Sequence, residues 1–210
     1  MQELLPLAGI AGAIAFGAIS PGPSFLMVAR ESVASSRTHG LLSALGMGIG
    51  GVLFALAALA GLQAIFAAVP SLYLVLKLGG GIYLGYLGYK IWKSAASPLG
   101  ISETSTPVVI HSPARAFWIA LGTQVSNPKA AIIYTSVFAA FLPQHFGWPL
   151  GIGAILVVFT IETSWYTLVA LGLSSSRPRN AYLRYKAWVD RAAGGVMTLL
   201  GVKLVTSANQ

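Results

Sequence analysis

Long runs without charge dominate the pattern of apolar and polar positions along the chain. Residues 4–29 and 40–76 contain no Lys, Arg, Asp, Glu or His. A helix needs about 20 predominantly apolar residues to cross the hydrocarbon core of a bilayer. The run 40–76 is too long for one helix, and Pro70–Ser71 is a natural turn that divides it. The pattern therefore predicts a series of membrane-spanning helices.

The same criterion, applied to the whole chain, predicts six spans of about 20 residues each. They are 4–29, the part of 40–76 before Pro70, and then about 72–92, 116–142, 149–173 and 188–206. A polar stretch rich in Ser, Thr and Pro separates the third span from the fourth. We therefore expect three helices in residues 1–93, one long polar loop at 94–114, and three helices in residues 115–210.

Composition supports a membrane protein. The chain has 13 basic and 5 acidic residues in 210, so 9% of it is charged, whereas soluble domains are about 25% charged. Apolar residues make up 56%, and the mean hydropathy is +0.76. So few charges cannot cover a water-soluble surface, and a disordered chain would contain far fewer apolar residues. With no Cys and three widely separated His, the sequence predicts no cofactor and no metal centre.

The net charge of +8 would suggest a nucleic-acid partner for a soluble protein, but the positions of the basic residues favour another explanation. Most of them lie in or beside the loops that follow spans one, three and five, at Arg30, Arg37, Lys90, Lys93, Arg115, Arg177, Arg179, Arg184, Lys186 and Arg191. The loops around Pro70 and at 143–149 contain no Lys or Arg. Because basic loops stay in the cytoplasm, we expect the loop 94–114 inside, both termini outside, and no nucleic-acid partner.

Three spans are repeated within the chain. The pattern Gly-x5-Leu-Gly-x-Lys occurs at 81–90 and again at 194–203, an offset of 113 residues. Ser20–Pro23 in span one and Ser126–Lys129 in span four form a second pair at a similar offset. Because each unit has an odd number of spans, the two copies must enter the membrane in opposite senses. The predicted fold is an all-α integral membrane protein with six transmembrane helices in two inverted three-helix repeats, as in many secondary transporters.

Proline interrupts the first span. Pro21 and Pro23 lack N–H groups and clash with preceding carbonyls, so the helix must kink or break there. A half-helix that starts near Ser24 would aim free N–H groups and the positive end of its dipole into the bundle, and Gly22 would let a ligand approach the backbone. The carboxylate of a ligand matches such an end. The alternative is a tolerated kink that binds nothing.

Two charges lie at matching depth in consecutive spans. Glu162 stands 13 residues after Pro149, about 20 Å into its span, and Lys129 stands 13 residues before Leu142. A carboxylate at the bilayer centre costs at least about 2.5 kcal/mol and is kept when it is paired, protonated or functional. We expect the two side chains to face each other or to share a polar cavity. They form either a static ion pair or a binding site. In such a site Glu162 would accept a proton or a substrate ammonium, and Lys129 would bind a carboxylate.

The second break, at Asn127–Pro128, would supply the counterpart of the first, with the Asn127 side chain as donor or acceptor. Gln124, Thr160 and Thr163 either complete a polar lining or hold neighbouring helices together. The candidate substrate-binding residues are Ser20, Pro21, Gly22, Pro23, Ser24, Gln124, Asn127, Pro128, Lys129 and Glu162.

In these motifs the chain resembles the LysE/RhtB family of bacterial amino-acid exporters over nearly its full length. The similar positions are Ser20–Phe25, Leu41, Gly46, Gly48, Lys77, Gly79–Gly81, Tyr83–Leu84, Leu87–Gly88, Lys90, Phe117, Ser126–Lys129, Gly194, Gly201 and Lys203. The chain departs at 35–40, where the family usually has Gly before the basic residue. The resemblance implies a multi-pass protein of the bacterial inner membrane, an antiporter driven by the proton gradient that exports amino acids or closely related small metabolites.

Other functions stay open from the residues alone. An exporter of a small ion or metal, or a non-transporting membrane subunit, also fits the predicted helices. The absence of Cys and the single mid-membrane carboxylate disfavour metal transport. An intramembrane enzyme would need a nucleophile with a base, or paired carboxylates, at depth, so we expect no enzyme. Faces of small residues leave both a monomer and a homodimer open.

Overall fold

The computed structural model describes residues 4–68, 72–97, 112–174 and 176–206. The described residues form eight α-helices: α1 (Leu4–Ile19), α2 (Pro23–Ala34), α3 (Arg37–Ala68), α4 (Leu72–Ser94), α5 (Pro113–Val125), α6 (Pro128–Phe141), α7 (Trp148–Leu173) and α8 (Ser176–Thr206). The predicted turn at Pro70–Ser71 and residues 98–111 of the predicted polar loop lie outside the described residues.

Spans one and four are each divided into two helices where the sequence predicts a break. α1 ends at Ile19 and α2 begins at Pro23, and the two helices are bent by 57°. α5 ends at Val125 and α6 begins at Pro128. Each proline stands in the first turn of the second helix, where a missing N–H costs nothing because no intrahelical acceptor would be available. The predicted interruptions are therefore confirmed.

One predicted boundary is wrong. The sixth span was expected to start near residue 188 after a loop, but α8 begins at Ser176. Pro178 falls in the first helical turn, where proline is tolerated, and no further Pro or Gly occurs before Gly194. The Lys186 ammonium also donates to the carbonyl oxygens of Ala95 and Ser97 at 3.2 and 2.7 Å, which fixes this segment against the end of α4.

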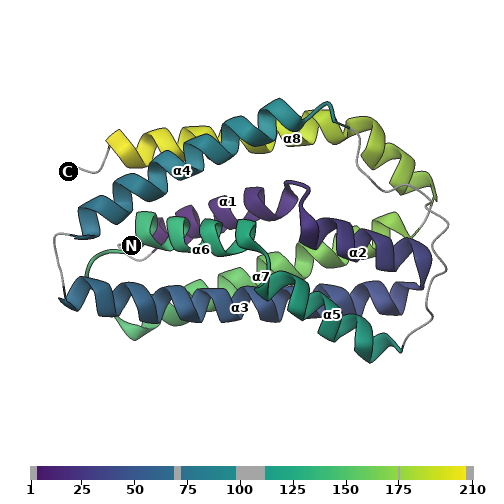
Figure 1. Cartoon of the computed structure of the whole chain (residues 1–210), viewed down its shortest axis with the longest axis horizontal. Helices are drawn as coiled ribbons and strands as arrows, with labels where there is room; N and C mark the ends of the chain where they lie inside the picture. Colours follow the sequence, from purple (N-terminus) through teal and green to yellow (C-terminus); the bar gives the residue numbers. More distant parts are fainter. Residues whose placement is uncertain (1–3, 69–71, 98–111, 175, 207–210) are drawn as a thin grey trace.

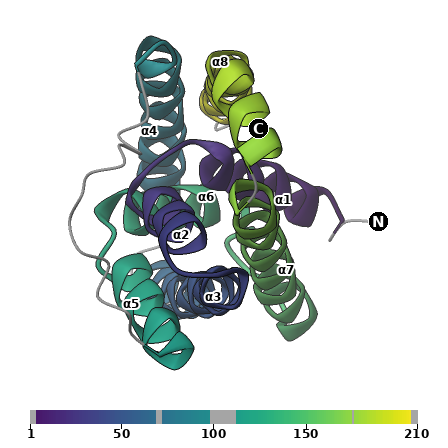
Figure 2. The ribbon, with the colours of Figure 1, turned by 90° about the vertical axis from the view of Figure 1, so that its right-hand side faces the viewer.

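The helices form layers around a short central pair (Figure 1). α4 and α8 lie side by side on one face, α3 packs against α7 on the other, and α1 and α6 contact each other between them. The end-on view in Figure 2 shows α2 and α5 beside α3. The centre of the molecule is therefore occupied by α1 and α6, one helix from each interrupted pair.

Small residues allow α4 and α8 to touch backbone to backbone. A Cβ atom added at Gly88 would lie 2.5 Å from the Gly194 carbonyl oxygen, and one at Gly194 would lie 2.6 Å from the Gly88 carbonyl oxygen. Gly81 and Gly201 meet in the same reciprocal way. The helices therefore run antiparallel, and the four glycines are those of the repeated sequence pattern.

Two buried apolar clusters divide at the helix breaks. One gathers side chains of α1 and α6, among them Ile14 and Phe138, with parts of α7 and α8. The other gathers side chains of α2, α3 and the second half of α7, among them Phe25 and Met47. The buried polar residues Ser20, Ser24, Gln124, Asn127 and Glu162 belong to neither cluster.

Length and apolar composition alone identify two described helices as able to cross a membrane. They are Arg37–Leu62 within α3 and the whole of α7, Trp148–Leu173. The bent pair α1 and α2, taken as one span, makes a third. α6 is apolar but has only 14 residues. The described chain is all-helical and contains clear membrane spans, while the count of six stays a prediction.

Candidate functional site

Both helix breaks border one small polar cavity, which we call the inner cavity. Its volume is about 30 Å³. Seven of the ten candidate residues line it: Ser20, Gly22, Ser24, Gln124, Asn127, Lys129 and Glu162. Two tyrosines, Tyr134 and Tyr166, complete its polar wall, and apolar residues of α1 and α6 close it.

A continuous chain of buried hydrogen bonds runs from the second break to the carboxylate. The Asn127 side-chain amide donates to the Ser24 hydroxyl at 2.8 Å, and that hydroxyl donates to Gln124 Oε1 at 2.6 Å. The Gln124 amide donates to one Glu162 oxygen at 3.3 Å, and the Tyr134 hydroxyl donates to the other at 3.1 Å. Such a satisfied network fixes the orientation of every member, and the two donors that hold Glu162 within it, Gln124 and Tyr134, are neutral.

The first break presents a helix N-terminus to the inner cavity. Gly22 is the N-cap residue of α2 and makes no side-chain capping hydrogen bond. Its backbone is extended (φ −152°), which any residue can adopt, so its small size rather than its conformation sets it apart. The first N–H groups of a helix have no intrahelical acceptor and carry the positive end of the dipole. This end, with Ser24 in its first turn, suits an anionic group.

The second break is capped from within. The Asn127 side chain accepts the backbone N–H of Lys129 at 3.0 Å, which satisfies one donor of the first turn of α6. This N-terminus is therefore less available to a ligand than that of α2.

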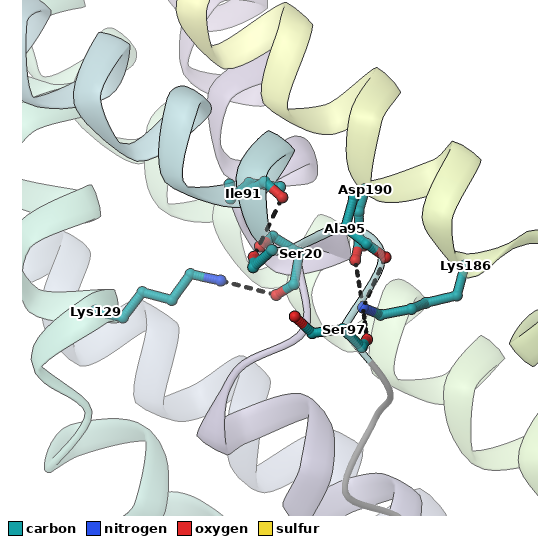
Figure 3. Close-up of polar contacts among 8 residues, drawn as sticks. Ser20, Ile91, Ala95, Ser97, Lys129, Lys186 and Asp190 are labelled. Atoms are coloured by element: carbon teal, nitrogen blue, oxygen red, sulfur yellow. Dashed lines mark hydrogen bonds and ion pairs between the residues drawn. The ribbon is translucent and has the colours of Figure 1, made fainter.

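Lys129 reaches across the cavity to the first break. Its ammonium donates to the carbonyl oxygens of Ser20 at 2.8 Å and Gly17 at 3.4 Å, at the C-terminal end of α1 (Figure 3). A cation favours such an end and disfavours the N-terminus of its own helix, so the α1 carbonyls account for its orientation. Lys129 and Glu162 line the same cavity but bond to different partners.

The remaining candidates lie elsewhere. Pro21, Pro23 and Pro128 shape the breaks but are not among the residues that line the inner cavity. Thr160 is exposed on α7. Thr163 is a further α7 residue outside the lining, and its buried hydroxyl has no hydrogen-bond partner among the residues that the structure describes.

Sequence reasoning missed the two tyrosines of the site. Tyr166 lies four residues after Glu162, on the same face of α7, and is 4% exposed. Tyr134 lies seven residues after Asn127, two turns along α6, and is 2% exposed. Helical spacing from the candidate residues would have found both.

A second buried carboxylate was also missed. Asp190 is 2% exposed and forms an ion pair with Lys186, with 3.0 Å between Lys186 Nζ and Asp190 Oδ2. Its other oxygen, Oδ1, has no hydrogen-bond partner in the described part of the chain. The pair lies on the far side of Ser20 from Lys129 (Figure 3). The i, i+4 spacing of opposite charges at the start of a span was the available signal.

Within the described ranges, His, Asp and Glu side chains never gather in a group of three, so no described residues form a metal centre. The inner cavity instead combines a carboxylate at one wall, a helix N-terminus at another and a lysine that crosses between the breaks. These groups complement the ammonium and the carboxylate of a small zwitterion.

Comparison with known proteins gives a consistent picture. The sequence profile described as LysE type translocator matches residues 15–208. A threonine efflux protein of Salmonella typhi is 33% identical over 190 residues, covering 90% of this chain and 92% of the relative. The threonine efflux protein of Escherichia coli (strain K12) is 33% identical over 193 residues, with the same coverage of 90% and 92%. A leucine efflux protein of Salmonella choleraesuis is 34% identical over 196 residues, covering 92% and 89%. No solved structure matches this chain.

Proposed function

The chain belongs to the LysE type translocator family, as its motifs suggested, and we propose that it exports amino acids from the bacterial cytoplasm in exchange for protons. Relatives named threonine and leucine efflux proteins match about nine-tenths of the chain, so small neutral amino acids of this kind are the proposed substrates. A translocator moves its substrate unchanged, and we assign no enzymatic activity to it.

The observation that carries the proposal is the pairing of Glu162 with the α2 N-terminus on one cavity. Glu162 receives the substrate ammonium, and the first turn of α2 receives the substrate carboxylate. A water molecule needs about 10–15 Å³, so the 30 Å³ of the inner cavity holds about two waters and not an amino acid. Substrate entry therefore requires side chains to move, and the flexible Lys129 is the side chain that crosses the space between the breaks.

The surroundings of Glu162 support the proposed proton exchange. The Gln124 amide and the Tyr134 hydroxyl that donate to Glu162 are neutral, so neither of them permanently neutralises the carboxylate. In a bilayer interior the charge is costly unless a proton or a cation compensates it. Proton and substrate ammonium then compete for the same carboxylate, so each substrate released outside is replaced by a proton that travels inward.

We further propose the inverted repeat as the architecture behind this exchange. The reciprocal contacts of Gly88 with Gly194 and of Gly81 with Gly201 support it, because a two-fold rotation that exchanges α4 with α8 would turn one contact into the other. The pairing of α3 with α7 and of α1 with α6 agrees with the same relation. Six spans would then rock about the two breaks, as in other transporters built from inverted repeats.

The proposed orientation places the ends of α2, α4 and α7 in the cytoplasm. Figure 1 shows the C-terminal ends of these helices and the beginnings of α3, α5 and α8 at one end of the bundle. Basic residues of these segments, such as Arg30, Lys93 and Arg115, favour the cytoplasmic side. Both termini would then face the outside.

Transport by inside-out membrane vesicles tests the function. With an imposed pH gradient, acid inside, wild-type vesicles should accumulate labelled threonine or leucine, and an uncoupler should release it. Glu162→Gln removes the exchangeable proton and should abolish uphill accumulation. Glu31→Gln, near the C-terminal end of α2, removes a carboxylate outside the inner cavity. Vesicles with this variant should accumulate amino acid as wild type does.

Equal membrane insertion of the three proteins, measured by immunoblot, is the necessary control. Uphill accumulation by Glu162→Gln at the wild-type rate would overturn the role of this carboxylate. Accumulation that is indifferent to the uncoupler would overturn proton exchange while leaving amino-acid export in place.

A further inference from the structure

A second, larger cavity adjoins the inner one on the side of α4. Its volume is about 320 Å³. α4 contributes Tyr83, Tyr86, Lys90 and Ser94, while Lys129 and Ser20 come from the two breaks. It lies near the end of the bundle that we place in the cytoplasm, because Ser94 is the last residue of α4.

The two cavities share one boundary. Ser20 and Lys129 line both of them, and the Lys129 ammonium donates to the Ser20 carbonyl oxygen at 2.8 Å. Figure 3 shows Lys129 and Ser20 meeting beside Ile91, which also lines the larger cavity. Lys129 and Ser20 therefore form part of the wall between the larger cavity and the inner cavity, where Glu162 lies.

The charge of the larger cavity differs from that of the inner one. Its described lining includes the cations Lys90 and Lys129 and contains no Asp or Glu, whereas Glu162 lines the inner cavity. Two ammonium groups with tyrosine and serine hydroxyls suit an anionic group such as a carboxylate. A third cavity, of about 180 Å³ beside Trp165 and Tyr182, has no charged residue in its described lining and does not suit a zwitterion.

We propose that the larger cavity is the cytoplasmic loading site, in which Lys90 and Lys129 bind the carboxylate of the amino acid before it reaches Glu162. This inference rests on the proposed export function and adds a site to it. When the substrate carboxylate draws the Lys129 ammonium away from Ser20, the boundary opens and the ammonium end of the substrate can reach Glu162. Binding of the substrate carboxylate thus opens the connection from the larger cavity to the inner cavity.

The absence of Cys from the chain makes a direct binding test possible. Ser94→Cys places a single thiol on the lining of the loading site, and Lys93→Cys places one on the adjacent residue outside the lining. In inside-out vesicles, threonine or leucine should slow the reaction of Ser94→Cys with an impermeant methanethiosulfonate at least about threefold, as expected when most sites are occupied. The same amino acids should leave labelling of Lys93→Cys unchanged.

Transport kinetics give the second measurement. Lys90→Gln should raise the substrate concentration for half-maximal export about tenfold, the effect of losing one hydrogen bond to a charged group, with little change in maximal rate. Lys90→Arg should restore it, and the matched charge removal Lys93→Gln should have no effect.

Three results would overturn the loading site. They are no protection of Ser94→Cys by amino acid, protection by added anionic lipid instead of amino acid, and wild-type export kinetics for Lys90→Gln. If Glu162→Gln still abolishes accumulation in these cases, export at the inner cavity stands and only the loading site fails. If wild-type vesicles accumulate no amino acid at all, the proposed function itself fails.

Discussion

The two helix breaks, which occupy corresponding places in the proposed inverted repeat, are completed differently. At the first break, the N-cap residue Gly22 has no side chain that could cap the N-terminus of α2. At the second, Asn127 caps its helix by accepting the N–H of Lys129 at 3.0 Å. Side chains of the second break also reach the first break. Lys129 donates to the Ser20 carbonyl and Asn127 donates to the Ser24 hydroxyl, each at 2.8 Å. The first break offers backbone groups, and the second supplies side chains.

This difference explains how a repeated element can form a single site. Two identical breaks would present two equal helix N-termini, and a small zwitterion has only one carboxylate. With α6 capped by Asn127, the N-terminus of α2 is the one left for an anion, and Lys129 becomes the movable cation between the breaks. At the α4–α8 contact, by contrast, Gly88 and Gly194 meet reciprocally. The halves are alike where they pack and unlike where they meet the proposed substrate.

The largest effect is expected from filling the first break. A Cβ atom at Gly22 would lie 3.3 Å from Lys129 Cδ and 3.4 Å from its Nζ. Gly22→Leu should therefore displace Lys129 from Ser20, occupy the inner cavity and lower export at least about tenfold, the cost of one lost hydrogen bond to a charged group. Gly12→Leu adds the same bulk to the same span, where a Cβ would meet nothing within 4 Å, and should export as wild type.

Export by equally inserted Gly22→Leu vesicles at the Gly12→Leu rate would show that the first break does not form the site. Gly22→Ala sharpens the comparison, because Lys129 need move only a few tenths of an ångström to accept the smaller side chain. Its export should fall between those of wild type and Gly22→Leu.

The next effect tests the likeness of the halves. Gly88→Ala and its repeat counterpart Gly201→Ala each place a Cβ 2.5 Å from a backbone carbonyl oxygen of the facing helix. Rigid backbone cannot yield as a side chain can, so each should destabilise the detergent-solubilised protein by about 1–3 kcal/mol, the usual cost of overpacking. Gly85→Ala, on the same helix, meets nothing within 4 Å and should leave the free energy of unfolding unchanged or slightly raised.

The measurement is the midpoint of thermal unfolding followed by tryptophan fluorescence. Equal losses for Gly88→Ala and Gly201→Ala agree with a two-fold relation of α4 and α8. A large loss for one and none for the other would contradict the proposed inverted repeat at this contact.

The breaks could be predicted because they depend on local chemistry. Pro23 and Pro128 impose a helix start through their own rings, whatever surrounds them. The start of α8 could not be placed, because a basic helical segment and a basic loop have the same composition. What distinguishes them here is the contact of Lys186 with the Ala95 carbonyl, 91 residues away in the sequence.

Similar reasons limit the prediction of the site. Depth along a span follows from counting residues, so Glu162 and Lys129 could be identified as charges at matching depth in their spans. Their partners depend on how each helix is rotated about its axis, which nothing in the sequence states. The bond from Gln124 to Glu162 joins α5 to α7, and Lys129 turns to carbonyl groups of α1 instead of the carboxylate. Backbone carbonyls are present at every residue, so composition cannot mark the ones that will serve as partners.

The smallest effect is expected from Asn127→Ala at the second break. It separates the contribution of Asn127 to helix capping from its contribution to the proposed binding site. Asn127→Ala removes the acceptor for the Lys129 N–H and the donor to Ser24, and should cost about 1 kcal/mol of stability as a lost N-cap. Ser112→Ala removes the matching cap of α5, which accepts the Arg115 N–H outside the inner cavity, and should cost a similar amount.

Export distinguishes the two caps. Only Asn127→Ala also releases Ser24 and leaves the α6 N-terminus uncapped, so it should slow export several-fold while Ser112→Ala exports normally. The substrate concentration for half-maximal export and the unfolding midpoint, measured on both variants, separate the effects. If the two variants lose stability and export equally, the difference between the breaks is a matter of helix capping and plays no part in recognition. If Asn127→Ala alone loses export, the unequal breaks are what turns two similar halves into one site.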